Sequence, residues 1–317
     1  MLHVRVIAPA DTTDAVIERI DGDVTVVNRV VVRGVAQCRD GRSGDLLMFD
    51  LARENANPVI ADLRALHVDD AGSIALDEAD TILSKAADDA ERAAPGRPED
   101  GVIWDAIEAK ADDDARMSWS FLTFLVLATL IAGTGRYLDQ PILIVGAMVV
   151  GPEFAPVSAI CYGLARWRTR LVPTGLATLL GGFAIASAVS LAVWAVAYAL
   201  GGIDARRAST GPMTNFIVQP DIWSLIVALL AGTAGVLSLT ASKSAALVGV
   251  FISVTTVPAA GTIALTLAVG DFHEAGSSLV QLLVNIAGMI VAGTVTLLVQ
   301  RAVWHQVGER RGVRPVS

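Results

Sequence analysis

Residues 141–165 read PILIVGAMVVGPEFAPVSAICYGLA, a stretch with the length and apolarity of a membrane span. Pro152 and Pro156 each lack a backbone N–H and clash with the preceding helical turn, so we predict a break in the helix here. Broken backbone is tolerated at membrane depth only where protein or water surrounds it. Glu153 lies in the same break, where a carboxylate is costly unless it is paired, solvated or protonated.

A second apolar stretch, Val248–Ala268, is interrupted at its centre by the sequence TTVPAAG, which begins at Thr255. Two broken spans in corresponding halves of a chain indicate a transporter-like fold with a site near the bilayer midplane. Thr255, Thr256 and the carbonyls before Pro258 could line a path for a substrate. The alternative is that the hydroxyls bond back to carbonyls of their own helix.

Charge divides the chain into two parts. Residues 1–117 contain 25 acidic and 13 basic side chains, a net charge of −12, whereas the remainder contains 7 acidic and 11 basic, a net charge of +4. Apolar residues are concentrated in the second part, so we predict an acidic water-soluble domain followed by a membrane domain. The acidity argues against nucleic acid as a partner, because phosphate binding needs a positive surface.

Residues 1–77 show strand and helix signals in the order β-α-β-β-α-β. The predicted strands are His3–Ile7, Val24–Val32, Asp45–Leu51 and Gly72–Leu76, and the predicted helices follow Asp11 and cover Pro58–Leu66. This order is that of a ferredoxin-like split unit, so we predict a small α+β domain. Its start, MLHVRVIAPADTTD, lacks the pattern of a signal peptide, and we therefore expect the domain in the cytoplasm.

Residues 78–116 are charged and helix-forming, and we predict a solvated connector there; an oligomer-forming or signal-coupling helix pair is the alternative. Residues 117–300 form the predicted membrane domain, and residues 301–317 a basic cytoplasmic tail. We predict six spans, each near the ~20 residues that cross a bilayer. They cover about 118–133, 141–165, 171–200, 222–241, 246–270 and 278–300.

The basic cluster Arg166–Arg170 and the basic tail place both termini in the cytoplasm, because basic loops stay inside. On this topology Arg136, Arg206 and Arg207 fall outside, against the rule. The six spans divide into two sets of three with the broken span second in each, and the two broken spans cross in opposite directions. We therefore predict an inverted 3+3 repeat with two broken helices, based on topology and spacing and not on residue identity.

The segment Ala147–Pro156, AMVVGPEFAP, resembles the signature of a prokaryotic multi-span family catalogued as a domain of unknown function, number three-eight-nine. Val254–Gly261 and Asn285 are similar to its other recurring features, and the resemblance covers roughly residues 115–300. It implies a multi-pass protein of the prokaryotic plasma (inner) membrane with no established biochemical activity. Many members of that family carry an apolar residue where this chain has Glu153.

Two interpretations of Glu153 stay open: a carboxylate that binds a proton or cation, or one that caps the backbone donors of a half-helix. Asn285 favours an interhelical hydrogen bond over a place in a solute path. The four histidines are scattered, and the two cysteines, Cys38 and Cys161, fall in different parts of the chain. We therefore expect no disulfide, no metal site, no cofactor and no enzymatic activity.

The predicted function is transport or channel-like movement of a small solute or ion through a site at the two broken spans. The residues predicted to form it are Glu153, Pro152, Pro156, Thr255, Thr256, Pro258 and Asn285. The alternative is a membrane-anchored sensor or scaffold whose N-terminal domain binds a small ligand or partner. The lipid bilayer is the expected surrounding in both cases, and the small-residue-rich spans favour a homo-oligomer.

Overall fold

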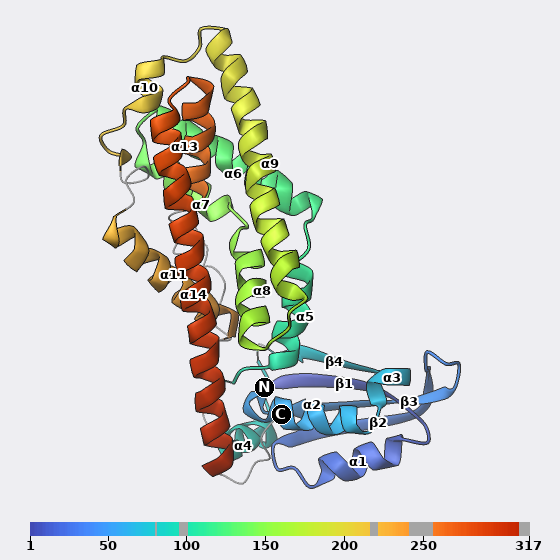
Figure 1. Cartoon of the computed structure of the whole chain (residues 1–317). Coiled ribbons are helices and arrows are strands. Elements are labelled where there is room, and N and C mark those ends of the chain that lie inside the picture. Colours follow the sequence, from blue (N-terminus) through green and yellow to red (C-terminus); the bar gives the residue numbers. More distant parts are fainter. Residues whose placement is uncertain (80, 95–100, 216–220, 241–255, 311–317) are drawn as a thin grey trace. The chain divides into compact units, whose positions relative to one another are not determined.

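The computed structural model describes residues 1–79, 81–94, 101–215, 221–240 and 256–310, and side chains up to residue 303. The chain divides into two compact units (Figure 1). The N-terminal unit is built mainly from Met1–Ala106, and the helical unit from Ile107–Leu239 and Lys243–Gln300. Each unit is described here by itself.

A four-stranded antiparallel sheet forms the centre of the N-terminal unit, with strand order β2-β3-β1-β4. The strands are β1 (Leu2–Pro9), β2 (Val26–Gln37), β3 (Ser43–Leu51) and β4 (Ser73–Glu78). The helices are α1 (Thr13–Asp21), η1 (Arg53–Asn55), α2 (Ala56–Ala65) and α3 (Val68–Ala71). All six predicted elements of this unit are present, and β2 is longer than its apolar run because the strand continues through Gly34 to Gln37.

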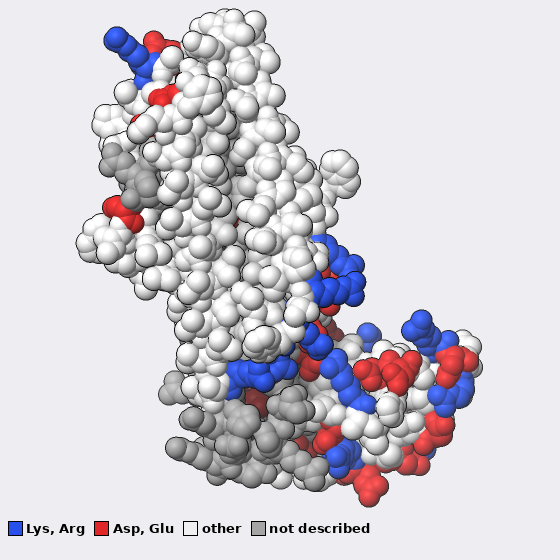
Figure 2. Space-filling view, viewed as in Figure 1, with Lys and Arg blue, Asp and Glu red and all other residues white. Residues whose placement is uncertain are grey.

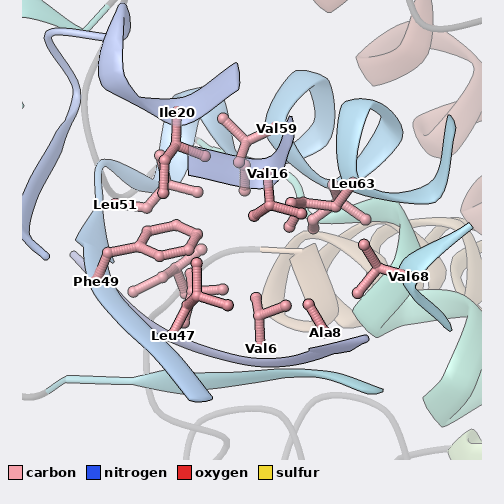
Figure 3. Close-up of a cluster of buried hydrophobic side chains, with 14 of the residues drawn as sticks. Val6, Ala8, Val16, Ile20, Leu47, Phe49, Leu51, Val59, Leu63 and Val68 are labelled. Carbon is pink, nitrogen blue, oxygen red and sulfur yellow. The ribbon is translucent and has the colours of Figure 1, made fainter. Parts of the chain in front are cut away.

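The core of this unit lies between one face of the sheet and the helices (Figure 3). Alternate residues of β1, which point to the same face of a strand, are buried, whereas His3 and Arg5 point to the other face. Val16 of α1 and Leu63 of α2 pack with Phe49 of β3 in this core. Helices α1 and α2 therefore cover one face of the sheet, as the alternating pattern requires.

The predicted connector, residues 78–116, is not solvated along its whole length. The side chain of Asn57 donates to the Val102 carbonyl at 2.7 Å and accepts from the Trp104 amide at 3.1 Å. Residues 101–104 are buried, and the first unit extends to Ala106. The connector therefore contributes its middle part to the core of the N-terminal unit.

The rest of the connector belongs to the helical unit. It includes most of α5 (Trp104–Asp114), which follows α4 (Lys85–Ala93). Glu108 of α5 accepts a hydrogen bond from the Tyr162 hydroxyl at 3.0 Å and pairs with Arg168 at 2.8 Å. Thr178 donates to the Ala115 carbonyl at 2.7 Å. These bonds fix the polar end of α5 to the helices that follow it.

Apolar helices make up the helical unit, and its surface in Figure 2 is almost free of charge over most of its length. The helices are α6 (Trp119–Tyr137), α7 (Pro141–Val150), α8 (Phe154–Ala165), α9 (Leu171–Ala199), α10 (Ala205–Ser209), α11 (Ile222–Thr240), α13 (Val257–Ala268) and α14 (Phe272–Arg310). Within the described residues, α6, α9, α11 and α14 are long and apolar enough to cross a membrane. The bent pair of α7 and α8 makes a fifth candidate span.

The predicted span over 246–270 is described from Thr256 onward, and its first half lies outside the described residues. The described half is α13, an apolar helix of 12 residues, which is too short to cross a bilayer by itself. The structure therefore shows four or five candidate spans in the part of the chain that it describes, where the sequence predicts six.

Glycines bring the helices of this unit into backbone contact. A Cβ on Gly261 of α13 would lie 2.7 Å from the Thr129 carbonyl oxygen and 2.7 Å from the Gly133 amide of α6. A Cβ on Gly288 of α14 would lie 2.9 Å from the Ala228 Cβ of α11. Small residues at helix crossings allow such close approach in membrane proteins. The half-helix α13 is held against α6 in this way.

We expect Gly261→Ala to lower the free energy of unfolding by about 1–3 kcal/mol, because the added methyl group meets backbone atoms that cannot rotate away. The measurement is the thermal unfolding midpoint of the detergent-purified full chain. Gly146→Ala is the matched control, since a Cβ there has nothing within 4 Å. Equal midpoints for the two variants would contradict the close contact between α13 and α6.

Glu54 is a buried carboxyl group in the N-terminal unit, only 7% exposed, and neither carboxylate oxygen has a hydrogen-bond partner among the described residues. Burial raises the pKa of Glu54 above its ordinary value, and the nearby Glu91 raises it further. The folded state therefore binds this proton more tightly than the unfolded state does. Its stability decreases as pH rises from the ordinary pKa of glutamate through the raised pKa.

We expect Glu54→Gln to be more stable than the wild type at neutral pH, by about 1 kcal/mol, because it removes a buried charge without hydrogen bonds. The difference should vanish on acidification below about pH 4, where the wild-type carboxyl group is protonated in both states. Thermal unfolding of the full chain across this pH range measures it. Glu18→Gln on the exposed face of α1 is the control. A wild type that matches or exceeds the variant at neutral pH would refute the expectation.

Candidate functional site

The predicted break in the first stretch is present and separates α7 from α8. Helix α7 ends at Val150, α8 begins at Phe154, and the two are bent by 55°. Pro152 lies in the connecting residues, where it cannot continue a helix. Pro156 has a different position from the one predicted, because it lies in the first turn of α8, where the missing N–H has no intrahelical partner in any case.

Glu153 occupies the N-cap position of α8, and Thr256 occupies the N-cap position of α13. The Thr256 hydroxyl Oγ1 donates to Glu153 Oε1 at 2.7 Å. Both side chains are buried, with exposed fractions of 1% for Glu153 and 0% for Thr256. Pro258 lies in the first turn of α13, in the same kind of position as Pro156 in α8. Glu153 at the first break and Thr256 at the start of α13, 103 residues apart in sequence, thus meet at one hydrogen bond. The residues before Thr256 lie outside the described part of the chain, so the second break stays a prediction.

The N-termini of two half-helices therefore converge on one carboxylate. In Figure 1, α8 and α13 extend from this point toward opposite ends of the helical unit. The N-terminal end of a helix carries partial positive charge from its aligned peptide dipoles. Neither N-cap side chain caps the backbone of its own helix. The described hydrogen bond of the Glu153 carboxylate joins two distant parts of the chain, and the interpretation of Glu153 as a cap stays a prediction.

Gly151 allows this junction to close. A Cβ at this position would clash with Glu153 Oε2 and would lie 2.7 Å from Val257 Cγ2, so a larger residue would displace the Glu153 carboxylate or Val257. The Gly151 backbone has φ −66° and ψ 127°, an extended conformation that ends α7 without any strain. Glycine is thus required here for space and not for its backbone freedom.

Two predicted site residues remain to be placed. Asn285 lies on α14, is fully buried and accepts a hydrogen bond from Gln281 Nε2 at 3.4 Å. This bond lies within one helix and joins two polar side chains one turn apart. Thr255 lies outside the described residues. The described geometry therefore brings together Glu153 and Thr256, with the prolines as the elements that start their helices.

Arg136 is a buried charge that the sequence does not identify as a site. It is the last basic residue of α6, its side chain is fully buried, and it donates to Thr214 Oγ1 at 2.9 Å and to the Gly211 carbonyl at 3.2 Å. Glu274 at the start of α14 lies 3.7 Å away as its counter-ion. The only sequence signal was a lone arginine at the end of an apolar run. Arg136 is therefore a buried, paired charge and not a solvated loop charge.

Among the described residues, no group of three or more His, Cys, Asp or Glu side chains is placed to hold a metal ion. What the Glu153 site can do by itself is bind a proton or interact with a cation through one carboxylate and one hydroxyl group. A carboxylate at this depth is costly unless its partners offset the loss of water. The hydrogen bond from Thr256 supplies part of that compensation.

Apolar helices of this number and length, together with a polar site at a helix break, indicate a polytopic α-helical membrane protein as the class. The model of the family described as "Domain of unknown function (DUF389)" matches residues 148–291, which confirms the family resemblance carried by the two proline motifs. The matched segment contains the break between α7 and α8, the hydrogen bond from Thr256 to Glu153 and about half of α14.

One curated relative is the "Uncharacterized protein MJ0678" of Methanocaldococcus jannaschii, 26% identical over 185 residues. The matched region covers 58% of this chain and 55% of the relative, so the chain spans about half of that protein's length. No solved structure matches this chain. The relative's printed name carries no activity, and the functional argument therefore rests on the site.

We expect Thr256→Val to lower the free energy of unfolding by about 1–3 kcal/mol, because it removes the hydroxyl donor to a buried carboxylate and leaves the volume unchanged. Thr256→Ser retains the donor and should recover most of the loss. Glu153→Leu removes the acceptor, and in the double variant Glu153→Leu/Thr256→Val the two effects should be less than additive. Thermal unfolding of the four proteins measures this coupling, and strict additivity would contradict the hydrogen bond.

Proposed function

We propose that this protein moves a small solute or ion across a membrane through the site formed by Glu153, Thr256 and the proline-started half-helices. The observation that carries the proposal is the buried hydrogen bond between two helix N-termini. An ionisable side chain inside a membrane unit is expensive and marks a substrate or proton pathway in many transport proteins. On this proposal the protein is not an enzyme.

The proposed architecture is six spans arranged as an inverted 3+3 repeat. Helices α8 and α13 support it, since both have 12 residues and both carry proline in the first turn. Discontinuous helices whose ends meet near the midplane form the substrate sites of inverted-repeat transporters. We place Pro152, Thr255 and Asn285 around the same path.

The proposed location is the plasma (inner) membrane of a prokaryote, with both termini in the cytoplasm. The basic cluster between α8 and α9 supports this orientation, because basic loops remain on the cytoplasmic side. Arg206 and Arg207 are exposed and would lie on the opposite side, where they count against this orientation, whereas Arg136 is buried.

A second candidate function is that of a membrane-anchored sensor or scaffold, acting through the N-terminal unit. Its strand order β2-β3-β1-β4 and its two split β-α-β connections support a ferredoxin-like unit. The edge strand β2 favours a binding role, because Val30, Val32 and Val35 are exposed on it. A second copy of the chain is the partner we propose for this edge, which would make the protein a homo-oligomer.

The test is flux into proteoliposomes that contain the full-length protein, under imposed gradients of protons, Na⁺, K⁺ or chloride. We expect flux of at least one of these ions, and we expect Glu153→Gln to lower its rate about tenfold or more, because the site loses its titratable group. Asp113→Asn, on the exposed part of α5, is the control and should leave the rate unchanged.

Both variants are first compared with the wild type in size-exclusion profile and unfolding midpoint, so that loss of fold is separated from loss of flux. Unchanged flux in Glu153→Gln would rule out the carboxylate as part of the path. An absence of flux for all four ions, with a concentration-dependent association that requires β2, would instead support the sensor or scaffold function.

A further inference from the structure

Helix α14 carries a polar stripe, which we define as Glu274, Ser278, Gln281 and Asn285. Their spacings of four, three and four residues place them on one face of the helix. Ser278, Gln281 and Asn285 are almost completely buried, with exposed fractions of 0%, 2% and 0%. A row of buried polar side chains inside an otherwise apolar helix requires a physical reason.

Part of this stripe has unsatisfied hydrogen-bonding groups. Ser278 Oγ and Gln281 Oε1 have no hydrogen-bond partner in the part of the chain that the structure describes. A buried polar atom without a partner costs about 1–3 kcal/mol, so such atoms normally bind water or a ligand. The stripe therefore provides acceptors and donors for water molecules inside the helical unit.

The depth of the stripe follows from the packing of α8 against α14. The Cys161 thiol donates to the Ile290 carbonyl at 3.5 Å, and the two helices run in the same direction in Figure 1. Glu153 lies eight residues before Cys161 on the chain, and Leu282 lies eight residues before Ile290. Because both helices rise about 1.5 Å per residue, Gln281 and Asn285 lie within about one turn of the depth of Glu153.

The other end of the stripe reaches the end of the helical unit. Glu274 has a side chain that is 25% exposed, and it pairs there with the fully buried Arg136. Arg136 in turn donates to the carbonyl of Ser209, the last residue of α10, and to the carbonyl of Gly211 in the loop that follows. The polar stripe thus runs from a partly exposed ion pair to the depth of the buried carboxylate.

We propose that this stripe is a proton path between the Arg136–Glu274 end of the helical unit and Glu153. The inference rests on the proposed function and deepens it, since it names the proton as the coupling species and identifies its entrance. A proton from bulk hydronium would pass along water held by Ser278, Gln281 and Asn285. It would end on the Glu153 carboxylate, forming one O–H bond and leaving water behind, with no change of oxidation state.

The chemistry of the site favours a proton over a metal cation. Hard cations such as Ca²⁺ or Mg²⁺ take six or more oxygen ligands at once, whereas a proton needs one basic oxygen and a chain of hydrogen bonds. The described residues at the junction supply one carboxylate and one hydroxyl group, Glu153 and Thr256. Hydroxyl and amide side chains such as those of the stripe can order a water chain because they both donate and accept hydrogen bonds.

The experiment measures access of water-borne Ag⁺ to single cysteines in the full-length membrane protein. Cys38→Ser/Cys161→Ser is the background, and the probes are Ser278→Cys and Gln281→Cys. Leu279→Cys and Leu283→Cys on the exposed apolar face of the same helix are the matched controls. Ag⁺ is applied in chloride-free buffer from each side of the membrane, and the thiols that remain are counted with a fluorescent maleimide after denaturation.

We expect Ag⁺ to block the two stripe positions about tenfold faster than the two controls, from the side that carries Arg136 and Glu274, because water does not reach lipid-facing positions. Equal rates at stripe and control positions from both sides would overturn the path. The background is checked by its unfolding midpoint, since Cys161 donates a hydrogen bond that serine can replace.

The outcomes separate this inference from the proposed function. In one outcome, Ag⁺ reacts at the stripe positions but flux does not depend on Glu153. This outcome would support a hydrated path and refute Glu153 as the transport site. Flux that requires Glu153, with unreactive stripe positions, would support the site and refute this entrance. Reactive stripe positions together with proton flux that requires Glu153 support both.

Discussion

The helical unit depends on one hydrogen bond, that between the Thr256 hydroxyl and the Glu153 carboxylate. A buried carboxylate loses its hydration, which costs free energy. Hydrogen-bond donors and positive electrostatic potential from the surrounding protein must offset that cost. Here the donor is a hydroxyl from the other half of the chain, and two helix N-termini supply the positive potential. The same hydrogen bond therefore stabilises the buried carboxylate and connects α8 with α13.

Close helix packing follows from this constraint, because the half-helices can meet only if nothing stands between them. Gly151 leaves the space that the Glu153 carboxylate and Val257 occupy, and Gly261 lets α13 lie against the backbone of α6. Lipid supplies no hydrophobic force between apolar helices, so contact of this kind depends on van der Waals packing of small residues. An isolated helix of 12 residues is only marginally stable, so α13 is stabilised by packing against its neighbouring helices.

Charge in the helical unit is concentrated at a few paired positions. Arg136 and Glu274 form an ion pair at one end, and Glu108 binds Tyr162 and Arg168 where α5 approaches α8. A buried charge that loses its partner is strongly destabilising, so the contacts of the buried Arg136 also fix the segment around Gly211 and Thr214. The polar stripe of α14 begins at the first of these pairs, which links the end of the unit to its centre.

The sequence by itself determined the break between α7 and α8 and the element order of the N-terminal unit, because proline and alternating apolar residues act locally on the backbone. It also indicated Glu153 and Thr256 as polar residues at the breaks, since charge and hydroxyl groups stand out in an apolar run. It did not show that the two residues are bonded, that Arg136 is buried, or that residues 101–104 belong to a core. Those features involve side chains about 50 to 140 residues apart, as in the Arg136–Glu274 pair, and only tertiary packing brings such groups together. Tertiary structure alone therefore decided which buried polar groups form hydrogen bonds or ion pairs with one another, because such pairing depends on distance in space and not on distance along the chain.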